Sequence, residues 1–548
     1  MRKKKLLSLV LTVALVLGCV TIPTSGVFAA ESVDAGTTMK AQAVKSGKIA
    51  SGGGTFKWTL DNAGTLKITG KGYLDLRLED LKTIRSDVKK IEISSGITDV
   101  TFSLFNFGGN QGGLPELKAL SLPSTVKSLN GSLRDCTNLE SISGGQNVKT
   151  IEANFFRDTK WIEKAGVRTL GKVFVSYNGT ESNITIPSGI IAIEDNAFAG
   201  NRALQSVTIP ASVTTIGTYA FGQCASLTTI KGGDNVTTIG YRALYGTPWL
   251  EAQSKAAVLG KVLVKYNGLA TAYTVPATIK SICDEAFAEC KTLESVVING
   301  SVKKVPDFAF RRCENLKSIT MPKSVTTIAY GAFDHCKSLA SVKLPASLKT
   351  IETGAFIFCS TLKSVQVNGG QTNTKLKSIG GKAFAACDDL KQLTIPWGLT
   401  EMGAFAYGYT NDKKSEWSII SDELLKVKGT TITGIKQSYG NWYAKDNGIS
   451  FKGTAKGSAL KKPTLTKKGK GNNLTLKFSK VSGATGYEVY SKSDYEGSTW
   501  NKYATATAKK ASVTVYSYPG TKYKVRAYRK SKTGGYQYSE FSKVLTCK

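Results

Sequence analysis

Few residues in this chain of 548 could carry acid–base or nucleophilic chemistry. His335 is the only histidine, and neighbouring copies of an internal repeat have Glu289, Arg312 and Phe358 at the same position. A Ser-His-Asp triad or a histidine-ligated metal would depend on that one residue. Ser-x-x-Lys occurs, as in Ser301–Lys304, but a chain rich in Ser and Lys contains it by chance. Because G-x-S-x-G, G-x-G-x-x-G, P-loop and calcium-loop motifs are absent from the sequence, we predict a protein that is not an enzyme and has no cofactor or metal.

The ten cysteines follow a pattern that indicates structure. Seven occupy the same repeat position, three residues after a Phe or the residue that replaces it: Cys136, Cys224, Cys290, Cys313, Cys336, Cys359 and Cys387. The sequence has no C-x-x-C pair, and a line of single cysteines does not make a tetrahedral zinc site. Two interpretations stay open, disulfides in an exported protein and a buried apolar ladder of thiols, and we favour the ladder.

These cysteines belong to a repeat of fixed length. The four copies at Phe287, Phe310, Phe333 and Phe356 are 23 residues apart, and each contains Ala-Phe, Cys and then Leu-x-x-apolar-x-apolar. A fixed period of this length with that leucine pattern predicts a leucine-rich-repeat solenoid. We therefore expect a mostly β fold in which each Leu-x-x-apolar-x-apolar segment is a strand with inward apolar side chains, and in which the Phe fills each core layer.

Two gaps interrupt the period. The distances from Phe156 to Phe198 and from Leu244 to Phe287 are 42 and 43 residues, and each gap contains a Trp followed by Gly-Lys-Val and Tyr-Asn-Gly. Asn-Gly after alternating apolar residues is a strong hairpin signal, so we predict a β-hairpin insert in each gap. The 88 residues from Phe156 to Leu244 indicate duplication of a three-repeat block.

A solenoid offers a long ridged surface, which favours binding over catalysis. The side chain between the two inward residues of each strand should point outward and form a row with one member per coil. We predict this row as the binding site: Val297, Thr320, Lys343, Gln366 and Thr394.

The residues before and after the repeats do not follow the 23-residue period. Residues 1–29 have the basic start, apolar core and Val27-Phe28-Ala29 site of a secretory signal peptide. A second interpretation is a lipoprotein signal with Cys19 as the lipidated residue, after Val16-Leu17-Gly18. We predict an N-terminal linker and β-hairpin cap at 30–90, the solenoid at 91–396 and a C-terminal cap at 397–456, which includes a short helix at Ser438–Lys445. We expect no transmembrane segment after the signal and a secreted protein, associated with the cell surface.

The remaining residues, 457–548, form a linker and a separate domain. Short alternating strands at regular spacing predict an antiparallel β-sandwich, with Tyr523 at a tyrosine corner. We expect Lys452–Lys462, rich in Gly, Lys and Ser, to be the linker.

Both parts resemble known families. Leu316–Cys336 (LKSITMPKSVTTIAYGAFDHC) is similar to the unit of BspA-type bacterial leucine-rich repeats, and Ala484–Tyr490 with Tyr523–Tyr528 resembles a fibronectin type III domain. Phe478 stands where that domain commonly has a strand Trp. The resemblance implies a secreted or surface-displayed adhesin that binds a protein or glycan, including one derived from a host.

Charge raises a second hypothesis. The net charge is +33, and the segment from Lys461 to the end holds 19 Lys and Arg against 4 Asp and Glu. Such a basic domain is either an ordinary solvated surface or an anchor to an anionic cell-wall polymer. The alternative function is then an envelope spacer protein. The sequence has no motif for sequence-specific nucleic-acid binding.

Overall fold

Each 23-residue repeat forms one coil with three sides. In the coil that starts at Ser318, strand β25 (Ser318–Thr320) forms the first side and β26 (Thr327–Ile328) forms the second. A turn closed by the Val325 amide, which donates to the Pro322 carbonyl oxygen, separates them. The third side is the turn around Ala332 and Phe333. Its amides donate to the next coil, as Phe333 N does to Ala355 O at 2.8 Å. Strand β25 pairs with the coil before it and β26 with the coils on both sides, so strand pairing and turn hydrogen bonds together join the stack.

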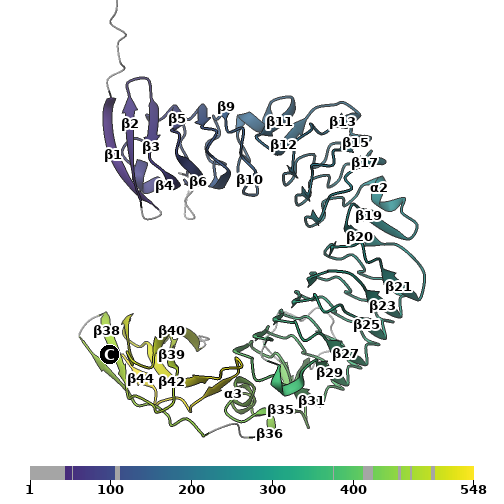
Figure 1. Ribbon diagram of the computed structural model, residues 1–548, viewed down its shortest axis with the longest axis vertical. Coiled ribbons are helices and arrows are strands. Elements are labelled where there is room, and N and C mark those ends of the chain that lie inside the picture. Colours follow the sequence, from purple (N-terminus) through teal and green to yellow (C-terminus); the bar gives the residue numbers. More distant parts are fainter. Residues whose placement is uncertain are drawn as a thin grey trace, which may run out of the picture.

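The structure is a computed structural model that describes residues 43–51, 54–104, 112–373, 375–411, 424–454, 458–469, 472–494 and 500–547. The coils stack into an arc, and a smaller β domain packs against its C-terminal end (Figure 1). The predicted signal peptide, including Cys19, lies outside the described residues. None of the helices in the described part of the chain has the length and hydropathy of a membrane-spanning helix.

The first sides form parallel strands along the outer side of the arc, paired in five successive segments (Figure 1). We call these segments together the outer sheet. Its repeat strands are β5 (Lys90–Ile93), β7 (Ala119–Leu122), β9 (Ser141–Gly144), β13 (Asn183–Thr185), β15 (Ser206–Ile209), β17 (Thr229–Gly232), β21 (Ala272–Val275), β23 (Ser295–Ile298), β25, β27 (Ser341–Leu344), β29 (Ser364–Val367) and β31 (Gln392–Thr394).

The second sides form another set of strands, of which β6 and β10 face the hollow of the arc (Figure 1). These strands are β4 (Gly72–Arg77), β6 (Ile97–Ser103), β8 (Ser128–Ser132), β10 (Thr150–Ile151), β14 (Ala192–Ile193), β16 (Thr215–Ile216), β18 (Thr238–Ile239), β22 (Ser281–Ile282), β24 (Lys304–Val305), β26, β28 (Thr350–Ile351), β30 (Ser378–Ile379) and β32 (Glu401–Met402). A short 3-10 helix, Gly370–Thr372, lies in the longer loop before β30.

The predicted phenylalanine layers form an unbroken stack from Phe287 to Phe384. The Phe310 and Phe333 rings are parallel with centroids 5.2 Å apart, and Phe333 stacks on Phe356 at 4.9 Å. Both neighbours and Phe333 itself are fully buried. Offset stacking of this kind adds to the stability that burial of the rings already provides.

The cysteine ladder lies beside this stack. The Cys336 thiol donates to the Phe310 carbonyl oxygen at 3.2 Å, and Cys313 and Cys359 make the same contact one coil away in each direction. All nine cysteines in the described residues are free. Burial raises the pKa of the Cys224 thiol to about 11, which keeps it a neutral hydrogen-bond donor. The structure thus favours the thiol ladder over disulfides.

The hairpin inserts form, but the turn is not where the Asn-Gly signal placed it. Each insert begins with a helical turn, α1 (Lys160–Glu163) or α2 (Pro248–Glu251), which the sequence prediction missed. The hairpins pair β11 (Gly166–Leu170) with β12 (Val173–Asn178), and β19 (Ala256–Leu259) with β20 (Val262–Tyr266). Their turns lie at Gly171 and Gly260, whereas the Asn-Gly pairs follow the second strand.

Gly171 shows why the turn is there. Its φ is +58°, and a Cβ added to it would lie 2.5 Å from the Val148 carbonyl oxygen of the preceding coil. Only glycine can both adopt this conformation cheaply and approach the neighbouring backbone so closely.

Additional elements close both ends of the arc. At the N-terminal end, β1 (Ala43–Ser51), β2 (Gly54–Asp61) and β3 (Thr65–Thr69) pair antiparallel, β3 then pairs parallel with β5, and a short 3-10 helix (Leu78–Leu81) follows β4. At the C-terminal end β31 pairs with β35 (Thr431–Ile435), and β35 with β36 (Ser450–Thr454), with α3 (Tyr439–Asp446) between the last two. A small hairpin of β33 (Tyr409–Asn411) and β34 (Leu424–Lys426) precedes them. Lys452, expected in the linker, lies in β36.

The C-terminal domain has two antiparallel sheets that share one core. One sheet contains β37 (Leu465–Lys468), β38 (Asn473–Phe478) and β41 (Ser512–Tyr516). The other contains β39 (Gly486–Lys492), β40 (Asn501–Thr507), β42 (Lys522–Lys530), β43 (Tyr536–Tyr538) and β44 (Leu545–Thr546). Tyr523, the predicted corner residue, is buried in β42. Its relation to fibronectin type III domains stays a prediction, as do the domain boundaries.

Candidate functional site

The predicted outward row lies on the outer sheet, in register within each paired segment. Val297 pairs with Thr320 across β23 and β25, and Lys343 pairs with Gln366 across β27 and β29. Thr320, Lys343 and Gln366 are exposed, whereas Val297 and Thr394 are partly covered. The pairing extends the row in both directions, to Thr274 before Val297 and to Thr433 after Thr394. The Thr394 and Thr433 hydroxyl groups are 2.9 Å apart and hydrogen-bonded. We call this set the outer row.

A second row of side chains lies beside it, and the sequence analysis missed it. It comprises the first residue of each outer strand, and its members are mostly hydroxyl residues: Ser206, Thr229, Ser295, Ser318, Ser341 and Ser364. Ser295 pairs with Ser318, and Ser341 with Ser364. The signal was present in the sequence, because Ser stands two residues before the outward position in four successive copies, at Ser295, Ser318, Ser341 and Ser364. We call this set the serine row.

Together the two rows give the outer sheet a hydroxyl-rich surface with scattered lysines. At the equivalent position of other outer strands, Lys231 on β17 pairs with Thr208, and Lys452 on β36 pairs with Thr433, so lysines occur there as well as at Lys343. Hydroxyl groups donate and accept hydrogen bonds, and lysine donates them and carries charge. This combination suits a polar or acidic partner.

His335 has a structural position. Its side chain is buried, and Nδ1 lies 2.5 Å from the Asp334 carboxylate, which Arg311 approaches at 3.3 Å from the other side. The His335 backbone is left-handed, with φ +59°, and its amide donates to the Ile357 carbonyl oxygen. Arg312 and Phe358, its counterparts in other coils, share that conformation. Within the described residues, no group of three or more His, Cys, Asp or Glu side chains is placed to hold a metal ion.

The two hairpin inserts create cavities that the sequence analysis did not anticipate. The first cavity, about 360 Å³, lies between the turn around Phe155 and the turn around Asp195. The second, about 490 Å³, lies between the turn around Ala243 and the turn around Asp284. Because the block that contains them is duplicated, corresponding residues line the two cavities. We call them the first and second insert pockets.

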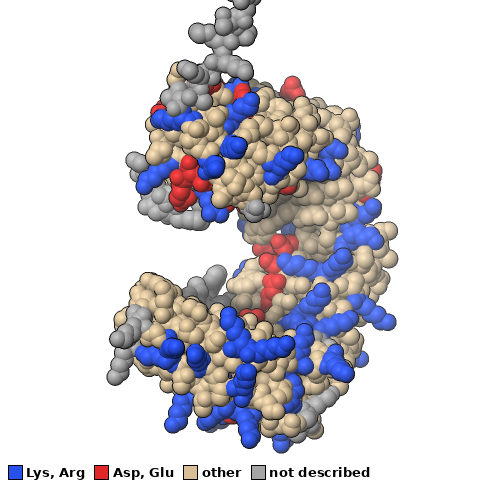
Figure 2. All heavy atoms as spheres, turned by 60° about the vertical axis from the view of Figure 1, so that its left-hand side comes forward, with Lys and Arg blue, Asp and Glu red and all other residues tan. Residues whose placement is uncertain are grey.

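Charge is distributed unevenly over the molecule. Figure 2 shows Lys and Arg side chains over the outer surface and the lobe that holds the C-terminal domain, and acidic side chains along the wall of the hollow. Lys461, Lys462, Lys467, Lys468 and Lys477 of the C-terminal domain are all exposed. We call these five lysines the basic patch.

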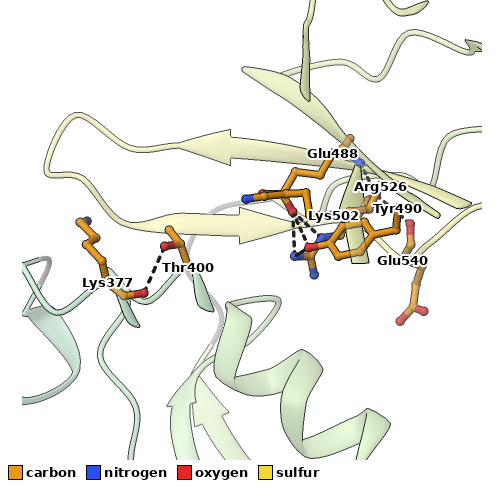
Figure 3. Close-up of polar contacts among 9 residues, drawn as sticks. Lys377, Thr400, Glu488, Tyr490, Lys502, Arg526 and Glu540 are labelled. Carbon is orange, nitrogen blue, oxygen red and sulfur yellow. Dashed lines mark hydrogen bonds and ion pairs between the residues drawn. The ribbon is translucent and has the colours of Figure 1, made fainter. Parts of the chain in front are cut away.

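Another basic segment of the C-terminal domain, Lys522–Lys532, is less exposed to solvent than its lysines and arginines would suggest. Arg526 is only 2% exposed, and it forms an ion pair with Glu488 at 2.8 Å and a hydrogen bond with the Tyr490 hydroxyl at 2.9 Å (Figure 3). Lys524 lies over the rings of Trp500 and Phe541, at 4.4 and 4.1 Å from their centroids. Arg526 and Lys524 therefore add little free positive charge to the surface of the domain.

Arg526 instead helps to hold the C-terminal domain on the solenoid. Its guanidinium carbon lies 5.3 Å from the centre of the Tyr439 ring in α3, and Tyr538 N donates to the Gln437 carbonyl oxygen at 2.7 Å. Trp397 Nε1 donates to Tyr536 O at 2.9 Å, and Tyr536 N donates back to Trp397 O at 3.1 Å. These contacts fix the orientation of the domain relative to the arc.

The geometry and the repeat identify the class of protein. The family described as BspA type leucine rich repeat region matches in six copies, over residues 84–174, 171–255, 265–375 and 371–424. These ranges cover more than half of the chain, and the chain belongs to this family.

Solved structures of leucine-rich repeat proteins are similar at low identity. A protein from Eubacterium ventriosum is 21% identical, with 68% of this chain and 97% of that chain covered and a TM-score of 0.27. A leucine rich cell surface protein from Faecalibacterium prausnitzii is 20% identical, with 68% and 97% covered and a TM-score of 0.26. The pneumococcal vaccine antigen PcpA is 16% identical, with 75% and 99% covered and a TM-score of 0.27. No curated protein matches the chain.

Proposed function

We propose that this chain is an exported interaction protein, displayed at the cell surface, that binds a protein or glycan through the outer sheet of its solenoid and carries out no catalysis. The observation that carries the proposal is the outer sheet itself, where the outer row and the serine row lie in register within the paired strands β21, β23 and β25 and again within β27 and β29. A repeated polar surface fits an extended partner, because each coil adds the same kind of contact. The partner is a host-derived or bacterial protein or glycan.

Lys343 provides the test. We expect a glycan and protein array probed with the full chain to select a ligand whose binding Lys343→Glu weakens at least tenfold. Lys349→Glu is the matched control. Lys349 is exposed on the same coil, but it follows the outer strand and lies outside the outer row. Equal loss in both variants would indicate a general charge effect, and no loss in either would move the binding site away from the outer sheet.

A second function has its own supporting observation. The basic patch is exposed on a domain whose docking contacts hold it in one orientation, so the domain could anchor the arc to an anionic wall polymer such as teichoic acid. Exposed charges are screened over about 8 Å at physiological ionic strength, so this attachment should weaken as salt rises. The fibronectin type III resemblance of the domain supports a spacer or anchor role and is part of the same proposal.

Retention on purified cell walls separates the two functions. The full chain and a variant with Lys467, Lys468 and Lys477 changed to Glu are compared on walls with and without teichoic acid across a salt series. Loss of retention in the variant and at high salt supports anchoring. If retention does not depend on salt, on teichoic acid or on the substitutions, the basic patch is ordinary surface charge.

A further inference from the structure

The first insert pocket exists because one coil lacks its third side. In ordinary coils the turn amides bond to the next turn, as Phe198 N does to Ala220 O. At the insert, β12 runs straight on, and the amide of its Tyr177 donates to Ala197 O instead. The turn around Phe155 and the turn around Asp195 are therefore two coil spacings apart, about 10 Å, with an extended strand as the floor between them.

The duplicated block repeats this arrangement at the second insert. There Tyr266 N of β20 donates to Ala286 O at 2.7 Å. In both pockets, residues at the same pair of repeat positions join the two facing turns, but the kind of contact differs. Asn196 Nδ2 donates to Asn154 Oδ1 at 3.2 Å in the first, and Arg242 forms an ion pair with Glu285 at 3.5 Å in the second. The second pocket is thus already bridged by charge, and the first is not.

Two carboxyl groups of the first pocket have no cationic partner. Among the described residues, neither Glu194 nor Asp195 has a Lys or Arg nitrogen within 4 Å, the distance for an ion pair. Glu194 accepts only the neighbouring Asp195 amide at 3.2 Å, and Asp195 accepts the Thr218 amide at 2.7 Å. Arg157 lines the pocket, but its side chain is largely exposed and lies near Asp158. The carboxyl groups are therefore available to a ligand.

The rest of the lining is suited to an aliphatic chain. The apolar surface comes from β10, the turn after it, α1 and β12, through Ile151, Phe155, Phe156, Ile162 and Val175. The Ser176 hydroxyl, also in the lining, is buried without a hydrogen-bond partner. A cavity with an apolar wall and a few convergent polar groups is the usual form of a small-molecule or side-chain site.

We propose that the first insert pocket binds a primary ammonium group on an aliphatic stem, with Glu194 and Asp195 on the ammonium and the apolar wall on the stem. The lysine side chain of a partner protein and a free aliphatic diamine share this chemistry. The site is distinct from the outer sheet, because it lies on the turn side of the coils. The second insert pocket, whose Glu285 is occupied by Arg242 and which has Cys283 in place of Glu194, does not share the specificity.

Protonation of Glu194 adds a second readout. Burial raises the pKa of the Glu194 carboxyl to about 7. The charged groups that line the same pocket are Asp195 on its own turn and Arg157 on the facing turn, and α1 and β12 contribute only uncharged side chains. Because the ammonium needs the ionised carboxylate, its binding should strengthen as pH rises from 6 to 8.

The test uses the full chain and probes of matched shape. Binding of pentylammonium, pentanol and pentanoate is measured by ligand-observed NMR titration at pH 6 and pH 8, and Nα-acetyl-lysine methylamide and cadaverine distinguish a lysine side chain from a free diamine. We expect saturable binding of pentylammonium, at least tenfold weaker binding of the other two pentyl probes, and at least tenfold loss in Glu194→Gln. Glu352→Gln removes the same charge at the equivalent position of a coil without an insert, and should leave binding unchanged.

Three results would overturn the proposal: no saturable binding of any amine, equal binding of pentanol and pentylammonium, or equal affinity of the wild-type chain and Glu194→Gln. Thermal melting of each variant establishes that it is folded. Binding by the lysine derivative but not by cadaverine would assign the pocket to a protein partner, and the reverse would assign it to a free diamine.

Discussion

At the scale of single residues, the phenylalanine at each Ala-Phe turn stabilises the solenoid through its burial and its stacking. Phe333 is fully buried and stacks on rings from both neighbouring coils. Its replacement removes both contacts and leaves a cavity that the bonded coils cannot close. We therefore expect Phe333→Ala to lower the free energy of unfolding by about 3–5 kcal/mol.

Urea unfolding followed by circular dichroism measures this loss. Leu269→Ala is the control, since Leu269 is 83% exposed and its truncation should change stability by less than about 0.5 kcal/mol. A Phe333→Ala variant as stable as Leu269→Ala would contradict the stacked core.

Glu194 should make stability depend on pH. Its folded pKa of about 7 is above the ordinary value of 4.5 because burial disfavours the charged form. The folded state therefore holds a proton that the unfolded state releases, and stability falls as pH rises from 4.5 to 7. Glu194→Gln has no proton to lose, so it should be more stable than the wild-type chain by about 1–3 kcal/mol at pH 8 and nearly equal at pH 4.

Thermal melting at several pH values tests this, with Glu352→Gln as the control at the equivalent repeat position. A Glu194→Gln variant that shows the wild-type pH dependence would mean that the carboxyl group is better solvated, or better paired, than the structure indicates.

The sequence was sufficient to predict most residue positions but not the insert pockets. A fixed period assigns every residue of a repeat to the same place in its coil, so the Phe core, the cysteine ladder and the outer row follow from counting. The pocket around Glu194 depends on the coil that lacks a turn, which brings Asn154 beside Asn196, 42 residues later. No local pattern encodes such a neighbour.

At the scale of elements, the hairpin inserts show where local signals mislead. Asn178-Gly179 is a strong turn signal, yet the hairpin turns at Gly171 because the preceding coil passes close to it. Strand β40 has no comparable signal in the sequence, because most of its residues are exposed and it lacks apolar alternation. Helical turns α1 and α2 are too short to leave a period in the sequence.

Gly171 and Gly189 form a matched pair that tests the role of close backbone approach. Both have positive φ, +58° and +84°, but a Cβ would meet the Val148 backbone at Gly171 and nothing within 4 Å at Gly189. We expect Gly189→Ala to cost only the conformational strain, about 1–2 kcal/mol, and Gly171→Ala to cost clearly more. Urea midpoints measure both. Equal costs would mean that the first insert does not pack on the preceding coil as the structure shows.

At the scale of the whole molecule, the C-terminal domain is fixed to the arc by contacts between distant residues. A Cβ on Gly535 would lie 2.1 Å from the Trp397 ring, so the domain docks only because residue 535 has no side chain. Sequence analysis treated the domain as attached through a linker, since nothing near Trp397 or Gly535 in the chain signals their contact.

Gly535→Val should therefore separate the domain from the solenoid. We expect a larger radius of gyration by small-angle X-ray scattering, with both parts still folded. Lys532→Ala, an exposed change in the same loop, is the control. Unchanged scattering for Gly535→Val would show that Trp397 does not hold the interface.

The central claim is that the outer sheet binds the partner, and lysine footprinting tests it most directly. The full chain is acetylated with and without the array-selected ligand, and modification is quantified at each lysine by mass spectrometry. We predict that Lys343, with Lys231 or Lys452 at the equivalent position of another outer strand, loses reactivity in the complex, while Lys349 keeps it. Protection of Lys349 and the lysines of the C-terminal domain, with Lys343 fully reactive, would contradict the claim.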